Sequence, residues 1–455
     1  MSEGKAAPKI AVVGGGSYQW GPKIIEDVAL NEDLSGSTLT LHDLDPEALE
    51  DLYRLGERMV SLSGADLALE KTTVLEEALA GADFVVLCIS TGGLDTMALD
   101  LEIPARYGVV QTVGDTVGPG GVFRALRNIP VVVGIARAME EHCPDAVMLN
   151  LTNPMTTLTR AVTKATSVRC VGLCHELFST LAMLSEMFDV PEEEVGVGVA
   201  GVNHFIWITA VSARGRDVTG EAFRRVAGGE ARERALGRSS SGDPFVNTWG
   251  MRTELCRTHG YLPAAGDRHV CEFVPGYLES DEERGRLDLR ITTMETRREK
   301  LAAAREKTRR MASGEEPIPL ERSREEISDI IAAMTTGRTS VNIMNLPNNG
   351  QLRGVPDGAV VETFGAVGGL GASGVAFGEL PPEVAALVHP HVWNAEVIVD
   401  AALAGDRDLA YRAFANDPLV GHRPGAREMF DEMFEAQSEY LSHFEEPSGL
   451  TAGPR

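Results

Sequence analysis

The sequence predicts an α/β fold, in which an N-terminal doubly wound parallel sheet is followed by a region of mixed α+β structure. Two observations support this prediction. Short runs of β-branched and aliphatic residues alternate with helical patterns as far as about residue 195. The first run leads into a glycine-rich turn, as at the start of a βαβ unit. Because the alternation weakens afterwards, two domains are expected, at residues 1–195 and 196–455.

The N-terminal domain begins with a predicted strand at residues 9–13, which precedes the glycines and a helical pattern. A helix is predicted at residues 46–62, where apolar residues recur at helical spacing. Further strands are predicted at residues 39–43, 84–89, 147–151 and 168–173. This is a Rossmann-type arrangement, like that of lactate and malate dehydrogenases, and it binds ligands at the carboxyl ends of its strands.

The C-terminal domain is expected to mix both kinds of structure. Residues 197–211 and 341–364 have the composition of strands, whereas residues 280–313 and 381–444 have helical patterns. The glycine-rich segment Gly365–Gly374 predicts a flexible surface loop.

The composition restricts the possible partners. The 455 residues include 67 acidic and 42 basic ones, and the net charge of −25 repels nucleic acids and anionic membranes. Residues 1–9 lack the apolar core of a secretion signal, and no apolar run is long enough to cross a bilayer. The six cysteines lack the spacing of a disulfide framework. A cytoplasmic protein that binds neither nucleic acid nor membrane is therefore expected.

A dinucleotide site is predicted at the turn after the first strand. Small residues there would let the backbone approach a pyrophosphate at a helix N-terminus, and the candidates are Gly14, Gly16, Ser17 and Tyr18. The fingerprint is imperfect, because Gln19 replaces the third glycine and Asp43 follows Gly16 by 27 residues instead of about 20. Asp43 would accept hydrogen bonds from a ribose and favour NAD over NADP, although it could also initiate the next helix.

Two segments could supply metal ligands. Cys174 and His204 each follow an apolar run, so both are expected at strand ends that face one crevice. A thiolate and an imidazole would leave open coordination positions for substrate oxygens. Taken from spacing alone, a buried thiol and a hydrogen-bonded core histidine remain the alternative.

Two further polar segments are candidates for contact with cofactor or substrate. Asn153 precedes a proline at the end of another strand, which would hold it extended toward the crevice, although asparagine is also common in turns. Asp267 is followed by Arg268 and His269, and this carboxylate could act as a base or belong to a structural ion pair.

Taken together, these segments resemble glycoside hydrolase family 4, whose members depend on NAD and a divalent metal. The resemblance covers nearly the whole chain and depends on the order of its motifs: Gly14-Gly15-Gly16-Ser17, Gly114-Asp115-Thr116, Gly118-Pro119-Gly120-Gly121, Asn153-Pro154, Gly172-Leu173-Cys174-His175, Gly201-Val202-Asn203-His204 and Asn345-Leu346-Pro347-Asn348-Asn349-Gly350. Family 4 is an exception to hydrolysis by two carboxylates.

The resemblance implies a path of oxidation and elimination with a retained cofactor. NAD takes hydride from C3 of the sugar, a base removes the acidified proton at C2, and the glycosidic oxygen leaves. Water then adds at C1, and NADH returns the hydride. A divalent cation at the C2 and C3 oxygens would stabilise the developing negative charge.

The resemblance also suggests roles for individual residues. Cys174 and His204 match the metal ligands, and Asn153 matches an asparagine that contacts the sugar hydroxyls beside the cofactor. The general acid is left open between His175 and Asp115, and Asp267 is expected to be the base. The metal is expected to be Mn²⁺, with Co²⁺, Ni²⁺ and Fe²⁺ as alternatives, since a Cys/His pair accepts several such ions. A homodimer or homotetramer is expected by analogy.

The substrate is expected to be an unphosphorylated α-galacturonide. The segment Gly93–Met97 offers no cation for a 6-phosphate, whereas Arg268 and His269 could receive a C6 carboxylate. The alternatives are α-galactosides, α-glucosides and α-glucuronides. Other classes are an NAD-dependent 2-hydroxyacid dehydrogenase, whose usual Arg and His-Gly signatures are not evident, and a non-catalytic NAD-binding module.

Overall fold

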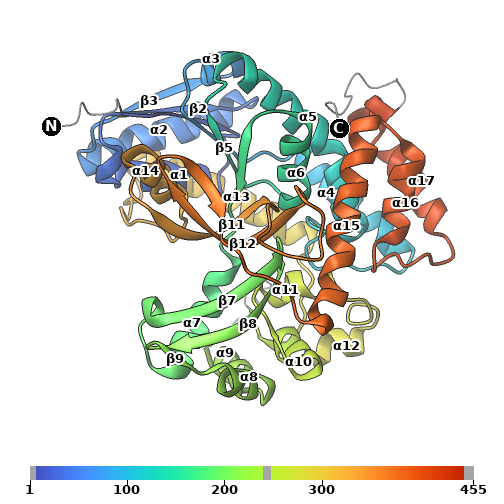
Figure 1. Cartoon of the computed structure of the whole chain (residues 1–455). Coiled ribbons are helices and arrows are strands. Elements are labelled where there is room, and N and C mark those ends of the chain that lie inside the picture. Colours follow the sequence, from blue (N-terminus) through green and yellow to red (C-terminus); the bar gives the residue numbers. More distant parts are fainter. Residues whose placement is uncertain (1–6, 239–246, 445–455) are drawn as a thin grey trace.

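The computed structural model describes residues 7–238 and 247–444. The described strands form one 13-stranded sheet, in the order β10-β8-β7-β12-β11-β6-β5-β4-β1-β2-β3, with β13 paired to β12 and β9 to β8. Figure 1 shows the N-terminal strands in the upper part of the molecule and β7 to β9 in the lower part. Among the described residues, every helix is too short or too polar to cross a membrane.

The N-terminal half forms the parallel part of this sheet. Strands β1 to β6 lie in the order β3-β2-β1-β4-β5-β6, and each pairs with its neighbours in parallel. This is the strand order of a doubly wound dinucleotide-binding fold, as predicted. The elements are β1 Lys9–Val13, α1 Gly21–Ala29, β2 Ser37–His42, α2 Pro46–Ser63, β3 Leu67–Thr72, α3 Leu75–Leu79, β4 Phe84–Leu87, α4 Gly93–Arg106, α5 Gly118–His142, β5 Val147–Asn150, α6 Met155–Ala165, β6 Arg169–Gly172 and α7 Glu176–Phe188.

The remainder of the chain is mixed α and β, also as predicted. Its strands pair antiparallel with one another, and β11 continues the sheet beyond β6. The elements are β7 Val195–Val202, β8 Phe205–Ala213, β9 Arg216–Asp217, α8 Thr219–Ala227, α9 Glu230–Arg238, α10 Gly250–His259, β10 Leu262–Pro263, α11 Asp267–Val270, α12 Asp281–Arg286, α13 Met294–Ser313, α14 Ile327–Thr336, β11 Ser340–Pro347, β12 Val360–Gly368, β13 Gly371–Gly374, α15 Pro382–Ala404, α16 Arg407–Asn416 and α17 Ala426–Ala436.

Helices cover both faces of the parallel sheet. On one face, α5 and α6 share a buried core with α15, α16 and α17, in which Phe123, Phe414 and Phe430 meet with ring centroids 5.4 to 5.8 Å apart. On the other face, α1 and α2 pack with α14. Helices from the second half of the chain therefore complete both cores: α14 completes one, and α15, α16 and α17, at the right of Figure 1, complete the other.

The predicted boundary at residue 195 lies between α7 and β7. Strands from both sides of that boundary belong to the same sheet, since Gly172 of β6 pairs with Asn345 of β11. The division into domains at residues 1–195 and 196–455 stays a prediction.

The prediction of a flexible loop at Gly365–Gly374 is wrong. Strands β12 and β13 form an antiparallel hairpin there, with Gly365 opposite Gly374. A Cβ on Gly374 would lie 2.1 Å from Cγ of Gln351, and one on Gly365 would lie 2.4 Å from Cε of Met344. These two glycines are required by close packing and not by mobility.

Candidate active site

The turn between β1 and α1 is pressed against the ends of its neighbouring strands. The N–H groups of Gly14 and Gly15 donate to the carbonyl of His42 at 2.9 and 2.8 Å. Gly14 has a φ of 94°, and a Cβ there would lie 2.3 Å from the carbonyl oxygen of Cys88. Only glycine fits at this position, so the backbone is bare where a dinucleotide would approach the N-terminus of α1.

Asp43 follows β2 directly and holds this turn in place. Its Oδ2 accepts from Gly16 N at 2.9 Å, and its Oδ1 accepts from Asp45 N at 3.0 Å. The nearby residues Ser17 and Tyr18 also have local partners: Ser17 Oγ accepts from Trp20 N at 3.2 Å, and the Tyr18 hydroxyl donates to Asp51 at 2.7 Å. Each carboxylate oxygen can accept more than one hydrogen bond, so Asp43 retains capacity for a ribose hydroxyl. Cofactor contacts by these residues stay predictions.

A cluster of metal-ligand type lies at the carboxyl end of the parallel strands. Asp115, His204 and His269 each offer a ligand atom, and these atoms lie within 4.8 Å of one another. The two imidazole rings have centroids 4.2 Å apart. His204 occupies the tight connection between β7 and β8 with a φ of 136°, a strained backbone conformation of the kind found at functional sites.

The electrostatics of this cluster suit a cation. Burial lowers the pKa of His204 to about 3 and also lowers the pKa of His269, so both rings are neutral near pH 7. Burial alone would raise the pKa of Asp115, but electrostatic interactions with His269, His204 and Arg124 and a hydrogen bond from Thr116 outweigh it and hold that pKa low. His269 Nδ1 is buried without a hydrogen-bond partner. Neutral imidazoles beside an ionised carboxylate are the form in which these groups bind metals.

Cys174 lies in the same region, although it is not a member of this three-residue group. Burial raises the pKa of its thiol well above the usual value, and the charges of Glu362 and Glu176 raise it further. Hydrogen bonds from Glu176 N and the Asn203 side chain lower it by less. Asn203 directly precedes His204, and its Oδ1 is buried without a partner. The thiol is therefore close to the His204 connection, and its role as a metal ligand stays a prediction.

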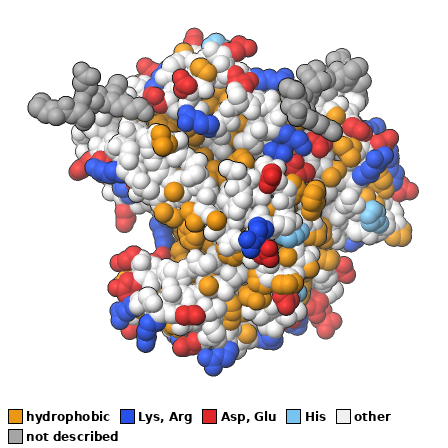
Figure 2. Space-filling view, viewed as in Figure 1, with side chains coloured by type: hydrophobic (Ala, Val, Ile, Leu, Met, Phe, Trp, Pro, Cys, Tyr) orange, Lys and Arg blue, Asp and Glu red, His pale blue; other side chains and the backbone are white. Residues whose placement is uncertain are grey.

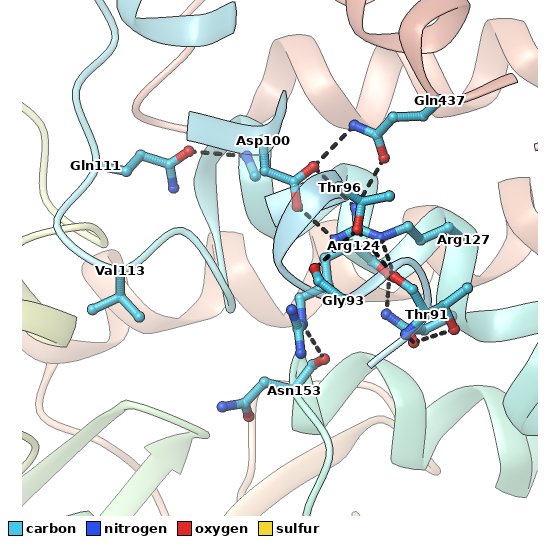
Figure 3. A network of polar contacts seen from close by, with 12 residues as sticks. Thr91, Gly93, Thr96, Asp100, Gln111, Val113, Arg124, Arg127, Asn153 and Gln437 are labelled. Carbon is cyan, nitrogen blue, oxygen red and sulfur yellow. Dashed lines mark hydrogen bonds and ion pairs between the residues drawn. The ribbon is translucent and has the colours of Figure 1, made fainter. Parts of the chain in front are cut away.

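Asn153 belongs to the cluster through its side chain. Its Nδ2 donates to Asp115 Oδ2 at 3.3 Å, whereas its Oδ1 is buried without a partner. Figure 3 shows that Arg124 reaches the backbone of Asn153, to whose carbonyl its Nε donates at 2.9 Å. The unpartnered amide oxygen is available for a ligand, as expected of a residue that contacts a sugar.

Asp267 occupies a closed ion pair. Its Oδ1 accepts from the backbone N–H of Arg252 at 2.9 Å and lies 3.3 Å from Arg252 Nε, with side chains 4% and 0% exposed. Its Oδ2 accepts from the Thr248 hydroxyl at 3.4 Å. These contacts confirm the structural ion pair that the sequence left open as an alternative, with Arg252 as the partner, and the role of Asp267 as base stays a prediction.

Arg268 and His269, which follow Asp267, have different contacts. His269 faces His204, and its Nε2 lies 3.6 Å from Glu176 Oε1. The backbone carbonyl of Arg268 accepts from the Thr112 hydroxyl. His269 is thus placed to bind a metal at least as well as a substrate carboxylate.

The two candidates for the general acid differ in charge. His175 Nδ1 lies 3.4 Å from Glu325 Oε2, and this hydrogen bond raises the pKa of the ring despite its partial burial. Asp115 has a lowered pKa and is ionised near neutrality. The raised pKa of His175 favours the protonated ring that a general acid needs, whereas the lowered pKa of Asp115 favours its ionised form, so these directions favour His175.

Sequence reasoning missed two carboxylates that build the site. Glu176 accepts from Gly266 N at 2.7 Å, and its pKa is lowered to about 2 because interactions with His269 and His204 and this hydrogen bond outweigh burial. Glu272, 1% exposed, accepts from the backbone N–H groups of Val113 and Gly114 at 2.6 and 3.0 Å. The only sequence signal was their position, directly after the Cys174 motif and three residues after His269.

Comparison with known proteins identifies relatives along nearly the whole chain. Residues 9–190 match the profile described as family 4 glycosyl hydrolase, and residues 199–420 match that of the family 4 glycosyl hydrolase C-terminal domain. The alpha-galacturonidase of Thermoanaerobacterium saccharolyticum is 39% identical over 456 residues, which cover 95% of this chain and 96% of that relative. Three other curated relatives with the same name are 34% to 36% identical.

Solved structures are also similar to this chain over nearly its whole length. The crystal structure of LplD from Bacillus subtilis has a TM-score of 0.87 and 35% sequence identity, and covers 94% of this chain and 99% of that chain. A 6-phospho-alpha-glucosidase from gut microorganisms, solved in complex with NAD and Mn²⁺, has a TM-score of 0.80 and 22% identity, with 95% and 98% covered. The second likeness concerns the fold alone.

Proposed function

The chain belongs to family 4 of the glycosyl hydrolases, and from that premise we propose that it hydrolyses unphosphorylated α-galacturonides with bound NAD and a divalent cation, Mn²⁺ in the first place. The observation that carries the proposal is the cluster of Asp115, His204 and His269, which lies at the same end of the sheet as the glycine turn. Four relatives with the name alpha-galacturonidase support the choice of sugar.

The residues present fit a divalent cation. His204 and His269 are neutral, Asp115 is ionised, and Asn153 Oδ1 and His269 Nδ1 are buried without partners. We propose that His204 and Cys174 hold the cation, with Asp115 and His269 as the further donors available. Nitrogen, oxygen and sulfur donors together suit Mn²⁺, Co²⁺, Ni²⁺ or Fe²⁺.

When bound, NAD accepts and returns a hydride at C3, and the cation supplies positive charge beside the C2 and C3 oxygens. The chain itself orients the sugar. Asn153 offers its unpartnered amide oxygen to a hydroxyl, and His175, whose pKa is raised, is the proposed proton donor for the leaving oxygen. Asp267 is the proposed base at C2, and its ion pair with Arg252 must open for that task.

The test is release of 4-nitrophenol from aryl α-galacturonide, α-galactoside, α-glucoside and α-glucuronide, with and without NAD and Mn²⁺, under a thiol reductant. We expect cleavage of the galacturonide only when both cofactors are present, with no net formation of NADH. Net NADH from hydroxyacids without cleavage would instead support a dehydrogenase. Cleavage without NAD would refute the redox path.

We also propose a homodimer or homotetramer located in the cytoplasm, by analogy with the family. Size-exclusion chromatography with light scattering measures the mass of the particle directly. A monomer at micromolar concentration would refute this part of the proposal and leave the chemistry untouched.

A further inference from the structure

An arginine of α5 has an open hydrogen-bonding edge within the site. Arg124 is partly buried, and its Nε donates to the carbonyl of Asn153 at 2.9 Å (Figure 3). Neither of its Nη nitrogens has a hydrogen-bond partner among the described residues, and neither is one of the fully buried unpartnered atoms. The outer edge of this guanidinium is therefore accessible.

The contrast with Arg127, one turn further along α5, shows that this is not the rule for the helix. Arg127 is fully buried and forms an ion pair with Asp100 at 2.6 Å. Its remaining donors reach Gln437 and the carbonyl of Thr91. Within the described part of the chain, Arg124 has no carboxylate partner within ion-pair distance. The charge of Asp115 stabilises the Arg124 guanidinium across the site, but the donors on its outer edge have no acceptor among the described residues, and a ligand can supply one.

A second arginine with an open edge approaches from α13. Arg297 donates from Nη2 to the carbonyl of Val113 at 3.0 Å and from Nε to the carbonyl of Thr292 at 3.3 Å. Both partners are neutral, and among the described residues its Nη1 has none. The bond to Val113 places Arg297 beside the loop that carries Asp115.

The two arginines and the cluster share one electrostatic environment. Burial lowers the pKa of Arg297, and the positive charges of Arg268 and Arg124 lower it further. The negative charges of Asp115 and Glu272 raise this pKa but do not outweigh burial. Both of those carboxylates already have protein partners, Asp115 in Thr116 and Asn153, and Glu272 in backbone N–H groups. The donors to these carboxylates are neutral groups, so neither carboxylate occupies the open edges of the two guanidinium groups.

We propose that Arg124 and Arg297 form the subsite for the C6 carboxylate of the sugar, and so determine specificity for uronides. This inference rests on the proposed function. A guanidinium matches a carboxylate in shape and can donate two parallel hydrogen bonds to it. Arg124 also donates to the backbone carbonyl of Asn153. The residue that binds the carboxylate is therefore held in a fixed position relative to Asn153, which contacts the ring hydroxyls.

The test compares two substrates that differ only at C6. Steady-state kinetics of the NAD- and Mn²⁺-loaded enzyme are measured on 4-nitrophenyl α-galacturonide and α-galactoside for the wild type, Arg124→Gln and Arg297→Gln. Loss of one charge-assisted contact should lower kcat/KM for the galacturonide about 10- to 100-fold more than kcat/KM for the galactoside, mainly through KM. Arg124→Lys, which keeps the charge and loses the planar edge, should fall between.

Arg298→Gln is the matched control, since Arg298 lies next to Arg297 on α13 but is exposed and pairs with Asp95. It should leave both substrates unchanged. Equal losses on both substrates, or weakened NAD binding in a fluorescence titration, would overturn the subsite while a galacturonide-cleaving wild type keeps the proposed function. A wild type that neither cleaves the galacturonide nor is inhibited by free galacturonate overturns both.

Discussion

Thr116 connects Asp115 to His204 through one hydroxyl group. Its Oγ1 donates to Asp115 Oδ1 at 2.7 Å and lies 2.9 Å from His204 Nδ1. A hydroxyl has only one proton to donate, so the bond to His204 requires Nδ1 to carry the hydrogen. The neutral ring then has its lone pair on Nε2, which is the tautomer that can bind a metal at that atom.

Replacement of Thr116 by valine should therefore weaken metal binding. We expect the dissociation constant for Mn²⁺ to rise about 10- to 100-fold, as is usual when a group that orients a metal-binding histidine is lost. Thr116→Ser keeps the hydroxyl and should bind Mn²⁺ as the wild type does. Titration of the NAD-loaded protein with Mn²⁺, followed by electron paramagnetic resonance, measures the constant. Equal affinity in the valine variant would contradict the assigned tautomer.

Removal of either proposed metal ligand should abolish metal-dependent turnover and leave NAD bound. Cys174→Ser and His204→Ala remove a thiolate and an imidazole, whereas the glycine turn lies at the β1–α1 connection. Activity on the aryl galacturonide and NAD affinity are measured side by side. Cys143→Ala, at a buried cysteine that caps the C-terminus of α5, is the control and should keep both. Turnover retained in Cys174→Ser would remove Cys174 from the ligand set.

Asp267→Asn separates two roles of one carboxylate. If the ion pair is its main task, the variant leaves Arg252 buried without a counter-charge and should lose about 3–5 kcal/mol of unfolding free energy. If Asp267 is also the base, deuterium from solvent should no longer enter C2 of the sugar. Denaturant unfolding and mass spectrometry of the product report the two effects separately. Native stability with normal deuterium entry would exclude both roles.

His391 makes stability depend on pH. Burial lowers the pKa of this ring to about 4, although a hydrogen bond with the carbonyl of Phe273 opposes the shift. Between pH 6.5 and 4 the unfolded chain binds a proton here that the folded chain does not, so stability falls as pH falls through this window. His391→Phe should reduce the slope of the free energy of unfolding against pH by up to about 1.4 kcal/mol per pH unit, which corresponds to one proton. Urea titrations at several pH values measure the slope, and identical slopes would contradict the assignment.

The parallel sheet was predictable because its strands are buried on both faces. Each of β1, β4 and β5 therefore appears as an uninterrupted apolar run that is readable without any partner. Strand β3 was not predicted, since Leu67–Thr72 lies at the sheet edge and carries Glu70 and Lys71 on exposed positions. The Gly365–Gly374 hairpin was mistaken for a loop because glycine composition alone does not distinguish close packing from mobility.

The site was predictable only in part, for a related reason. Asn153 and His204 follow strands, so the topology alone places them at one end of the sheet. Contacts such as Glu176 with Gly266, 90 residues apart, depend on how α7 and α11 pack, and neither propensity nor spacing contains that information. The electrostatic surroundings of a side chain are equally hidden in the sequence: Figure 2 shows acidic and basic side chains interspersed over the surface, whereas the partly buried Arg124 interacts with Asp115 through the fold.

The shared sheet has a consequence for synthesis on the ribosome. The core between α5 and α6 is closed by α15, α16 and α17, which are translated much later than α5 and α6. Until they emerge, the apolar faces of α5 and α6 lack their final covering, and β6 lacks its neighbour β11. The nascent chain therefore has an exposed sheet edge until β11 is translated, and chaperone engagement is expected to persist until α15, α16 and α17 dock.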